Sequence, residues 1–354
     1  MEIFIRGIGL VSPQPTTKKD YFFEEVMEYF DNKLYAVEPE IEMYLDPASS
    51  RRMSRILKLG VIASKICLVD SGVSMPDGII TGTGFGMVED TEKFLLGLLE
   101  SDERFLTPTP FIQSTHNTIG AYVSQMLKCH NYNFTYAHRG TSFETALIDG
   151  CMLIEEGNAR NVMVGGYEEN TENQIRIFDK IGRWKKEKIS NLELFQSDSP
   201  GTIAGEGVGF YMLSRYKGEN SCARLTNVQT FYQNMNKEDL VQAVERFLDR
   251  NNLTKDSIDA VLYGMNGDSE GDKIYHDLQQ SLFQEKIQTG YKHLCGESYS
   301  STIFALWVAA KMLKTQKVPP VIQLEPASPK PLNYVLIYNQ WQDKNHSLYL
   351  VSRC

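Results

Sequence analysis

Residues 132–150 read YNFTYAHRGTSFETALIDG and combine a strand, a tight turn and a helix. The run from Asn133 to Ala137 is strand-like, and apolar residues at helical spacing predict a helix over 143–156. The turn around Gly140 therefore has the layout of a nucleophile elbow, which presents one side chain at the N-terminus of a helix. The dipole and free amides there would stabilise a thiolate or an oxyanion. Because Gly140 has no side chain, the turn taken alone is interpreted as a structural element and not as a catalytic one.

Strand-like and helix-like segments alternate along the whole chain on both sides of this unit. Such alternation predicts an α/β fold in which sheets are sandwiched by helices. The predicted strands are 2–11, 79–84, 133–137, 161–169, 205–215, 223–234, 260–263, 334–338 and 347–352. The predicted helices are 52–71 with Gly72 as its stop, 117–128, 143–156, 238–250, one after Asp272, and 301–314.

The chain of 354 residues is long enough for two domains or for one large fold built from two similar halves. The first series of elements closes near Arg215, and the polar stretch 216–221 separates it from a shorter second series. We therefore expect two pseudo-symmetric halves, residues 1–215 and 222–354, each with a mixed sheet against shared central helices.

Composition excludes several classes of function. The net charge of −9 gives no sign of the excess of basic residues that binding to nucleic acid or to an anionic membrane requires. Without a long apolar stretch or a basic leader, we expect a cytoplasmic protein. The six cysteines are scattered without metal-ligand spacing, and the loop GTGFG at 82–86 fails the dinucleotide pattern. We therefore expect neither a metal nor a cofactor.

One short segment carries clustered positive charge. Arg51, Arg52, Arg55 and Lys58 lie close together in the sequence. This cluster is either a docking patch for an acidic carrier protein or the solvated face of a helix.

Further motifs follow one another along the chain. In the first half they are GTGFGM at 82–87, PTPFIQSTHNTIGAYVS at 108–124, the elbow, MVGGYEE at 163–169 and GEGVGFYML at 205–213. In the second half they are NGDSEGD at 266–272, KHLCGE at 292–297 and PPVIQLEPASP at 319–329. Their order resembles that of a β-ketoacyl-acyl-carrier-protein synthase: NGDSEGD resembles the HGTxTPxGD loop, KHLCGE resembles the KxxxGH loop, and PPVIQLEPASP matches a later segment. The resemblance covers nearly the whole chain. It implies a thiolase-like five-layer α-β-α-β-α fold, a dimer, and an acyl carrier protein as a partner.

Members of this family use a cysteine that carries the acyl chain and two histidines that assist decarboxylation and stabilise the enolate. Carried over by motif, Gly140 stands at the cysteine, Asn266 at the first histidine if its loop is two residues short, and Glu297 at the second. Only the motif lysine, Lys292, remains, and it is the natural partner of Glu297. The family's glycine-rich loop near the C-terminus, which supplies an oxyanion donor, is replaced by NQWQDKNHS at 339–347.

Loss of the attacking residue in a covalent enzyme can cost on the order of 10⁶ in rate, so condensation through Gly140 is excluded. Cys295 is the best spare thiol, although a small buried side chain is the commoner role for such a cysteine. We expect Cys151 to lie in the core, and His138 and His116 to be hydrogen-bonded packing residues. Ser142 is expected to cap the following helix rather than to act as a nucleophile.

Three functions therefore stay open. The first is a catalytically silent, chain-length-factor-like partner of an active synthase in fatty acid, polyketide or aryl-polyene biosynthesis. The second is a repurposed acyltransferase or thioester-processing enzyme that uses Glu297, Lys292 or Cys295. The third is a stand-alone binder of acyl groups or carrier protein. Substitution of all three catalytic positions together favours the first.

The resemblance also predicts where subunits meet. FIQSTHN at 111–117 and NFTYAH at 133–138 lie at or beside the subunit interface in synthases. We expect a dimer through these segments, either with an intact synthase or with a second copy of this chain.

Overall fold

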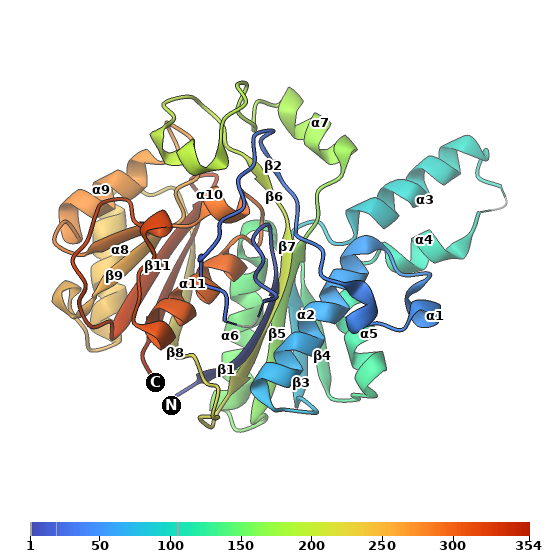
Figure 1. The fold of residues 1–354 in the computed structure, drawn as a ribbon, viewed down its shortest axis with the longest axis horizontal. Helices are drawn as coiled ribbons and strands as arrows, with labels where there is room; N and C mark the ends of the chain where they lie inside the picture. Colours follow the sequence, from blue (N-terminus) through green and yellow to red (C-terminus); the bar gives the residue numbers. More distant parts are fainter. Residues whose placement is uncertain (1, 19, 105) are drawn as a thin grey trace.

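The computed structural model describes residues 2–18, 20–104 and 106–354 (Figure 1). Within them ten strands form one sheet in the order β10-β9-β11-β12-β8-β1-β7-β5-β3-β4, and β2 pairs with β6 apart from it. The strands of the large sheet are β1 Phe4–Val11, β3 Gly78–Gly82, β4 Tyr132–Tyr136, β5 Asn161–Glu168, β7 Gly207–Ser214, β8 Ala223–Tyr232, β9 Ala260–Tyr263, β10 Ile287–Gly290, β11 Tyr334–Trp341 and β12 Asn345–Ser352. The small pair is β2 Lys33–Leu34 and β6 Ala204–Gly205.

The two ends of the large sheet repeat one strand pattern. In chain order, β1, β3, β4, β5 and β7 occupy the same relative places as β8, β9, β10, β11 and β12. In each set the three strands farthest from the junction are parallel, and the remaining pairs are antiparallel. The sets join where Phe4 and Ile5 of β1 pair with Arg224 and Ala223 of β8.

Helices cover both outer faces and fill the space between the two sets of strands. The α-helices are α1 Pro47–Ser50, α2 Arg55–Ser71, α3 Val88–Glu100, α4 Pro108–Gln113, α5 Thr118–Leu127, α6 Ser142–Glu155, α7 Glu172–Lys180, α8 Lys237–Arg250, α9 Lys273–Leu282, α10 Lys292–Cys295 and α11 Thr302–Thr315. One apolar cluster joins α2 and α5 to the first strand set, and another joins α8 and α9 to the second. The largest cluster packs α6 and α11 between the sets. The α/β class predicted from the sequence is confirmed.

The elements predicted from the sequence are all present, with ends displaced by a few residues. Gly72 closes α2 with a φ of 65°, a conformation that glycine adopts without strain. Helices α3, α4 and α7 and strand β10 were not predicted from the sequence. Helix α3 buries only Asp90 and α4 buries no residue, so neither packs an apolar face into the core.

Strands β11 and β12 are longer than predicted because a tight turn joins them. Gln342 and Asp343 in this turn have φ values of 52° and 55°. Two consecutive left-handed residues are typical of the turn that continues the twist of a hairpin. The hairpin extends β11 as far as Trp341. No helix among the described residues is long and apolar enough to cross a membrane.

Close packing of α2 on β1 depends on glycine at Gly9. A Cβ atom placed there would lie 2.7 Å from the backbone nitrogen of Cys67 and would also overlap the carbonyl oxygen of Ala63. Backbone atoms of a buried helix cannot move aside at low cost.

We expect Gly9→Ala to lower the free energy of unfolding by about 2 to 3 kcal/mol through overpacking. Urea unfolding followed by circular dichroism measures the change. Gly97→Ala is the matched control, because a Cβ at Gly97 in α3 would meet only Leu106 at 3.8 Å. That control should gain up to about 1 kcal/mol. Equal stability of Gly9→Ala and the natural chain would contradict the packing described here.

Candidate functional site

The elbow predicted from the sequence is present between β4 and α6. Arg139, Gly140 and Thr141 form a single 3₁₀ turn, and α6 begins at the next residue. Ser142 holds the turn: its hydroxyl donates to the carbonyl of Thr83 at 2.9 Å and accepts from the N–H of His138 at 2.8 Å. Because both of these bonds are backbone contacts in a fully buried site, Ser142 is a structural residue and not a free nucleophile.

The space above Gly140 is occupied by the indole of Trp341. A Cβ atom at Gly140 would lie 2.7 Å from Cγ and 2.8 Å from Cβ of Trp341, closer than such atoms pack. Trp341 is the last residue of β11 and is 5% exposed. It belongs to the NQWQDKNHS segment, which therefore fills the space next to Gly140.

Aromatic rings and one cation close the rest of this site. The guanidinium carbon of Arg183 lies 3.9 Å from the ring centroid of Trp341 and 4.9 Å from that of Phe178. The Tyr299 and Trp341 rings lie 4.3 Å apart. The cavity that remains between them has a volume of about 20 Å³. This is room for about one water molecule and not for an acyl chain. The cavity is partly open to solvent, and we call it the sealed cavity only because its volume shuts out anything much larger than a water molecule.

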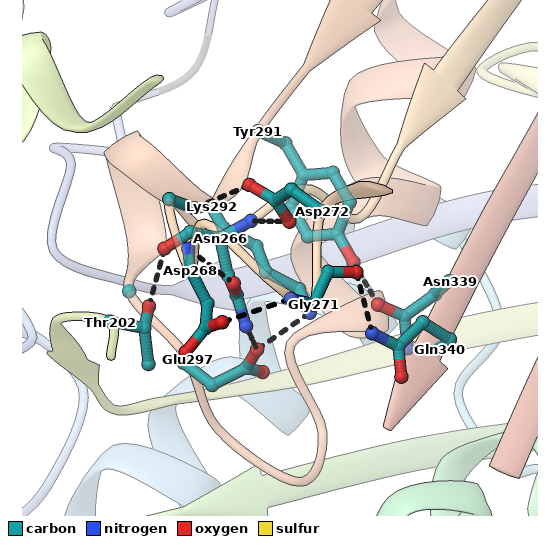
Figure 2. Close-up of polar contacts among 12 residues, drawn as sticks. Thr202, Asn266, Asp268, Gly271, Asp272, Tyr291, Lys292, Glu297, Asn339 and Gln340 are labelled. Atoms are coloured by element: carbon teal, nitrogen blue, oxygen red, sulfur yellow. Dashed lines mark hydrogen bonds and ion pairs between the residues drawn. The ribbon is translucent and has the colours of Figure 1, made fainter. Parts of the chain in front are cut away.

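Three of the four predicted site residues meet in one buried polar network (Figure 2). Lys292 donates to Oε2 of Glu297 at 2.8 Å, and the side-chain amide of Asn266 donates to the same oxygen at 2.6 Å. The side chains of Lys292 and Glu297 are 1% and 3% exposed. The predicted ion pair is therefore present. Each charge neutralises the other, so neither group is available as a free base.

The NGDSEGD loop is held in place by its own last residue (Figure 2). Asp272 accepts hydrogen bonds from the N–H groups of Asn266 at 3.0 Å and Gly267 at 2.7 Å. Burial raises the pKa of Asp272 to about 6. The Thr202 hydroxyl donates to the carbonyl of Asn266 at 2.6 Å. These bonds fix the backbone of Asn266 and so aim its amide at Glu297.

The fourth predicted residue reaches this network only indirectly. Gly140 touches Trp341, and Trp341 and Glu297 both line the sealed cavity. The family correspondence of these residues predicts that Gly140 faces Asn266 and Glu297 across a cavity. In the structure the indole of Trp341 packs against Gly140, and Gly140 does not line the cavity that Trp341 and Glu297 share.

The spare candidates have structural roles. Burial raises the pKa of the Cys295 thiol far above its usual range, so no thiolate forms there near neutral pH. Cys151 is half-buried against the central core, with a pKa raised by burial to about 12. The His138 ring lies 2.7 Å from the Thr141 hydroxyl, and His116 is exposed. Within the described residues, no group of three metal-ligating side chains could hold a metal ion.

Two acidic residues of the sealed cavity were not predicted. Glu168 ends β5 and accepts from the hydroxyls of Thr83 at 3.1 Å and Ser300 at 3.2 Å, and Glu169 accepts from the N–H of Glu89 at 3.0 Å. Burial raises the pKa of Glu168 to about 7 and that of Glu169 to about 8. The sequence analysis placed both residues at the end of the predicted strand 161–169, but nothing in the MVGGYEE motif indicated a cavity.

We expect the Gly140 and Trp341 sites to be energetically coupled. Gly140→Ala should cost about 1 to 3 kcal/mol because the new methyl overlaps the indole, and Trp341→Ala should cost about 3 to 5 kcal/mol because it leaves a cavity. The double variant should lose less than the sum of the two, because the smaller residue at 341 makes room for the methyl. Urea unfolding measures all three. Additive losses, like those expected for Trp341→Ala combined with Gly97→Ala, would contradict the contact.

The buried acids predict a pH dependence of stability. Between the ordinary carboxyl pKa of 4.5 and the raised values, the folded chain keeps protons that the unfolded chain releases. Stability should therefore fall as the pH rises from about 5 to about 8. Glu169→Gln should make this fall shallower by about 2 kcal/mol, since a neutral amide loses no proton. Urea titrations across this range measure it, with exposed Glu172→Gln as control. An unchanged slope in Glu169→Gln would contradict the assignment.

By sequence alone, the chain has no significant match among curated proteins. Solved structures of similar fold include the ishigamide ketosynthase/chain length factor, which is 14% identical with a TM-score of 0.80 and covers 100% of this chain and 99% of that one. They also include the ketosynthase ApeO in complex with its chain length factor ApeC from Xenorhabdus doucetiae, at 15% identity, a TM-score of 0.80 and coverage of 100% and 98%.

A third similar structure is AntDE:AntF, a type II polyketide synthase acyl-carrier protein in complex with its ketosynthase, at 12% identity, a TM-score of 0.78 and coverage of 100% and 99%. At these identities the likeness is one of fold. A family profile described as Beta-ketoacyl synthase, N-terminal domain matches residues 8–218, which is more than half of the chain. The chain therefore belongs to the β-ketoacyl synthase family.

Proposed function

We propose that this chain is a catalytically silent β-ketoacyl synthase homologue that acts as a chain-length-factor-like partner of an active synthase. The pathway class would be fatty acid, polyketide or aryl-polyene biosynthesis. The observation that supports this most directly is the packing of Trp341 against Gly140, which leaves neither a nucleophile nor room for one.

The proposal includes the correspondence of site residues. Gly140, Asn266, Glu297 and Lys292 stand for the family's cysteine, two histidines and lysine. Condensation needs a thiol to carry the acyl chain and neutral or cationic donors to stabilise an enolate. A carboxylate at Glu297 would repel that enolate, and the sealed cavity of about 20 Å³ admits no acyl chain.

A repurposed enzyme is less well supported. Lys292 and Glu297 bind each other in a buried pair, and the Cys295 thiol is 6% exposed with a strongly raised pKa. None of the three is both reactive and accessible, as a new catalytic group would have to be.

An apolar surface supports the pairing of this chain with another subunit. Strand β4 is an edge of the large sheet, with Tyr132 and Phe134 exposed by 42% and 47%. Helices α3 and α4 project from the side of the body (Figure 1). They expose further large apolar side chains, Leu95, Leu96, Leu99, Phe111 and Ile112. We call these seven residues the arm surface.

Soluble chains rarely leave so many large apolar side chains and a sheet edge uncovered. The arm surface includes the start of FIQSTHN and part of NFTYAH, the segments expected at the interface. We propose that an intact synthase covers it, with a homodimer as the default form of the isolated chain. The similar structures named above include ketosynthases paired with chain length factors.

We also propose that the fold is the five-layer thiolase-like one and that it consists of two halves. The repeated strand order and the three apolar clusters fit the five-layer thiolase-like arrangement. We place the division between its two halves, 1–215 and 222–354, in the segment after β7, which ends at Ser214.

Co-expression with an intact Cys-His-His synthase and carrier protein from the same gene cluster tests the function. We expect a 1:1 complex on size-exclusion chromatography, with condensing activity that neither subunit has alone. Leu99→Asp and Phe134→Asp should weaken the complex at least about tenfold, because each buries a charge in an apolar interface.

Val69→Asp is the matched control, since Val69 is 81% exposed on α2 and lies outside the arm surface. It should leave the complex intact. Intact-mass spectrometry should find no acyl group on this chain after incubation with acyl carrier protein. The proposal would be contradicted if the two chains formed separate homodimers and the synthase were fully active alone. A stable thioester on Cys295 would also contradict it.

A further inference from the structure

We propose that the sealed cavity is a binding site for one fixed water molecule, which bridges Asn170, Gln174 and Glu297. This water ties helix α7 to the buried pair of Lys292 and Glu297. The inference rests on the contacts of these side chains and does not depend on the proposed function.

Three residues that line the sealed cavity each have one buried side-chain atom without a hydrogen-bond partner among the described residues. These atoms are Nδ2 of Asn170, Oε1 of Gln174 and Oε1 of Glu297. A buried polar atom without a partner is costly, so such atoms are rare in folded proteins. Three of them around one small cavity indicate a bound molecule that supplies the missing hydrogen bonds.

The three atoms do not satisfy one another. Nδ2 of Asn170 is a donor and the other two atoms are acceptors, yet within the described chain neither oxygen accepts a hydrogen bond from it. Polar groups that line one cavity without meeting are commonly bridged by water. Backbone bonds hold two of the residues in place. The N–H of Asn170 donates to Oε2 of Glu206 at 3.1 Å, and the N–H of Gln174 donates to the Thr171 hydroxyl at 3.1 Å.

The chemistry of these atoms identifies the ligand as water. One donor and two acceptors require a molecule that accepts one hydrogen bond and donates two, and water does both. A halide ion has no proton to donate to the oxygens of Gln174 and Glu297, and an ammonium ion has no lone pair to accept from Asn170. The cavity volume of about 20 Å³ exceeds the roughly 10 to 15 Å³ that one water needs.

Glu297 has one carboxylate oxygen free for this water. Its Oε2 already accepts from Lys292 at 2.8 Å and from Asn266 at 2.6 Å (Figure 2). Its side chain is 3% exposed, so bulk solvent does not satisfy Oε1. The water therefore extends the buried network from Glu297 to Gln174 in α7 and to Asn170 just before that helix.

A second cavity of the same volume, about 20 Å³, provides an internal comparison. Its lining includes Leu10, Val208 and Cys295. Of the described residues that line it, none has a buried side-chain atom without a partner. Volume alone does not fix a water, because an ordered water needs two to four polar partners. We therefore expect no water with three side-chain contacts in this second cavity.

A crystal structure of the full chain, at a resolution that shows ordered water, tests the site. We expect one water peak in the sealed cavity, about 3 Å from each of the three atoms. Gln174→Met keeps the length of the side chain but removes the acceptor, so it should lower the occupancy of this water at least about twofold. Asp179→Asn is the matched control, because Asp179 is exposed on the same helix, and it should leave the peak unchanged.

Three results of that experiment would overturn the inference. They are no peak in the natural chain, a direct hydrogen bond between Asn170 and Gln174 in its place, and a halide ion recognised by its anomalous signal.

A double-mutant cycle tests the bridge in solution. One change is Gln174→Met, and the other is Lys292→Met combined with Glu297→Met, which removes the ion pair as a unit and leaves neither charge buried alone. Urea unfolding gives the folding equilibrium constant of each variant. The combined loss should be at least about threefold smaller than the product of the separate losses, because either change already breaks the bridge.

Gln174→Met combined with Gly97→Ala is the control for the cycle, and its two effects should multiply. Multiplying effects in the test pair would overturn the bridge to Glu297. If the variant without the ion pair does not fold, the crystal structures of the natural chain and of Gln174→Met still decide the matter.

Discussion

The contact between Gly140 and the indole of Trp341 is the constraint on which the site depends. A glycine in the elbow lets the ring lie against the backbone, 2.7 Å from where a Cβ would be. The ring then supports Arg183 on its face and Tyr299 at its side, and these groups close the cavity. An active condensing site needs the reverse: a reactive side chain at the elbow and an open space in front of it. The two arrangements exclude each other sterically.

The closed site balances its buried charges without a substrate. Lys292 offsets Glu297, and Asn266 donates a further hydrogen bond to the same carboxylate. Glu168 and Glu169 have no cation of their own in this arrangement, and their pKa values are raised by burial, so they hold protons near neutral pH. In a working enzyme such perturbed groups serve proton transfer. In this chain the same perturbation predicts a dependence of stability on pH.

Much of this organisation could be predicted from local sequence. The elbow at 132–150, the end of α2 at Gly72 and the pair Lys292 and Glu297 depend on residues close together in the chain, and all three are present. The packing of Trp341 against Gly140 could not be predicted, because the two residues lie 201 positions apart in the chain and only the fold brings them together. For the same reason Arg55 was counted with a basic patch, although the fold pairs it with Glu206. Helices α3, α4 and α7 were not predicted from the sequence, and each buries at most one residue in the fold.

These three helices also expose apolar side chains that a partner protein could cover. Helices α3 and α4 expose Leu95, Leu96, Leu99, Phe111 and Ile112, and α7 exposes Ile177. The arm surface is apolar, which suits a desolvated interface with a second folded subunit.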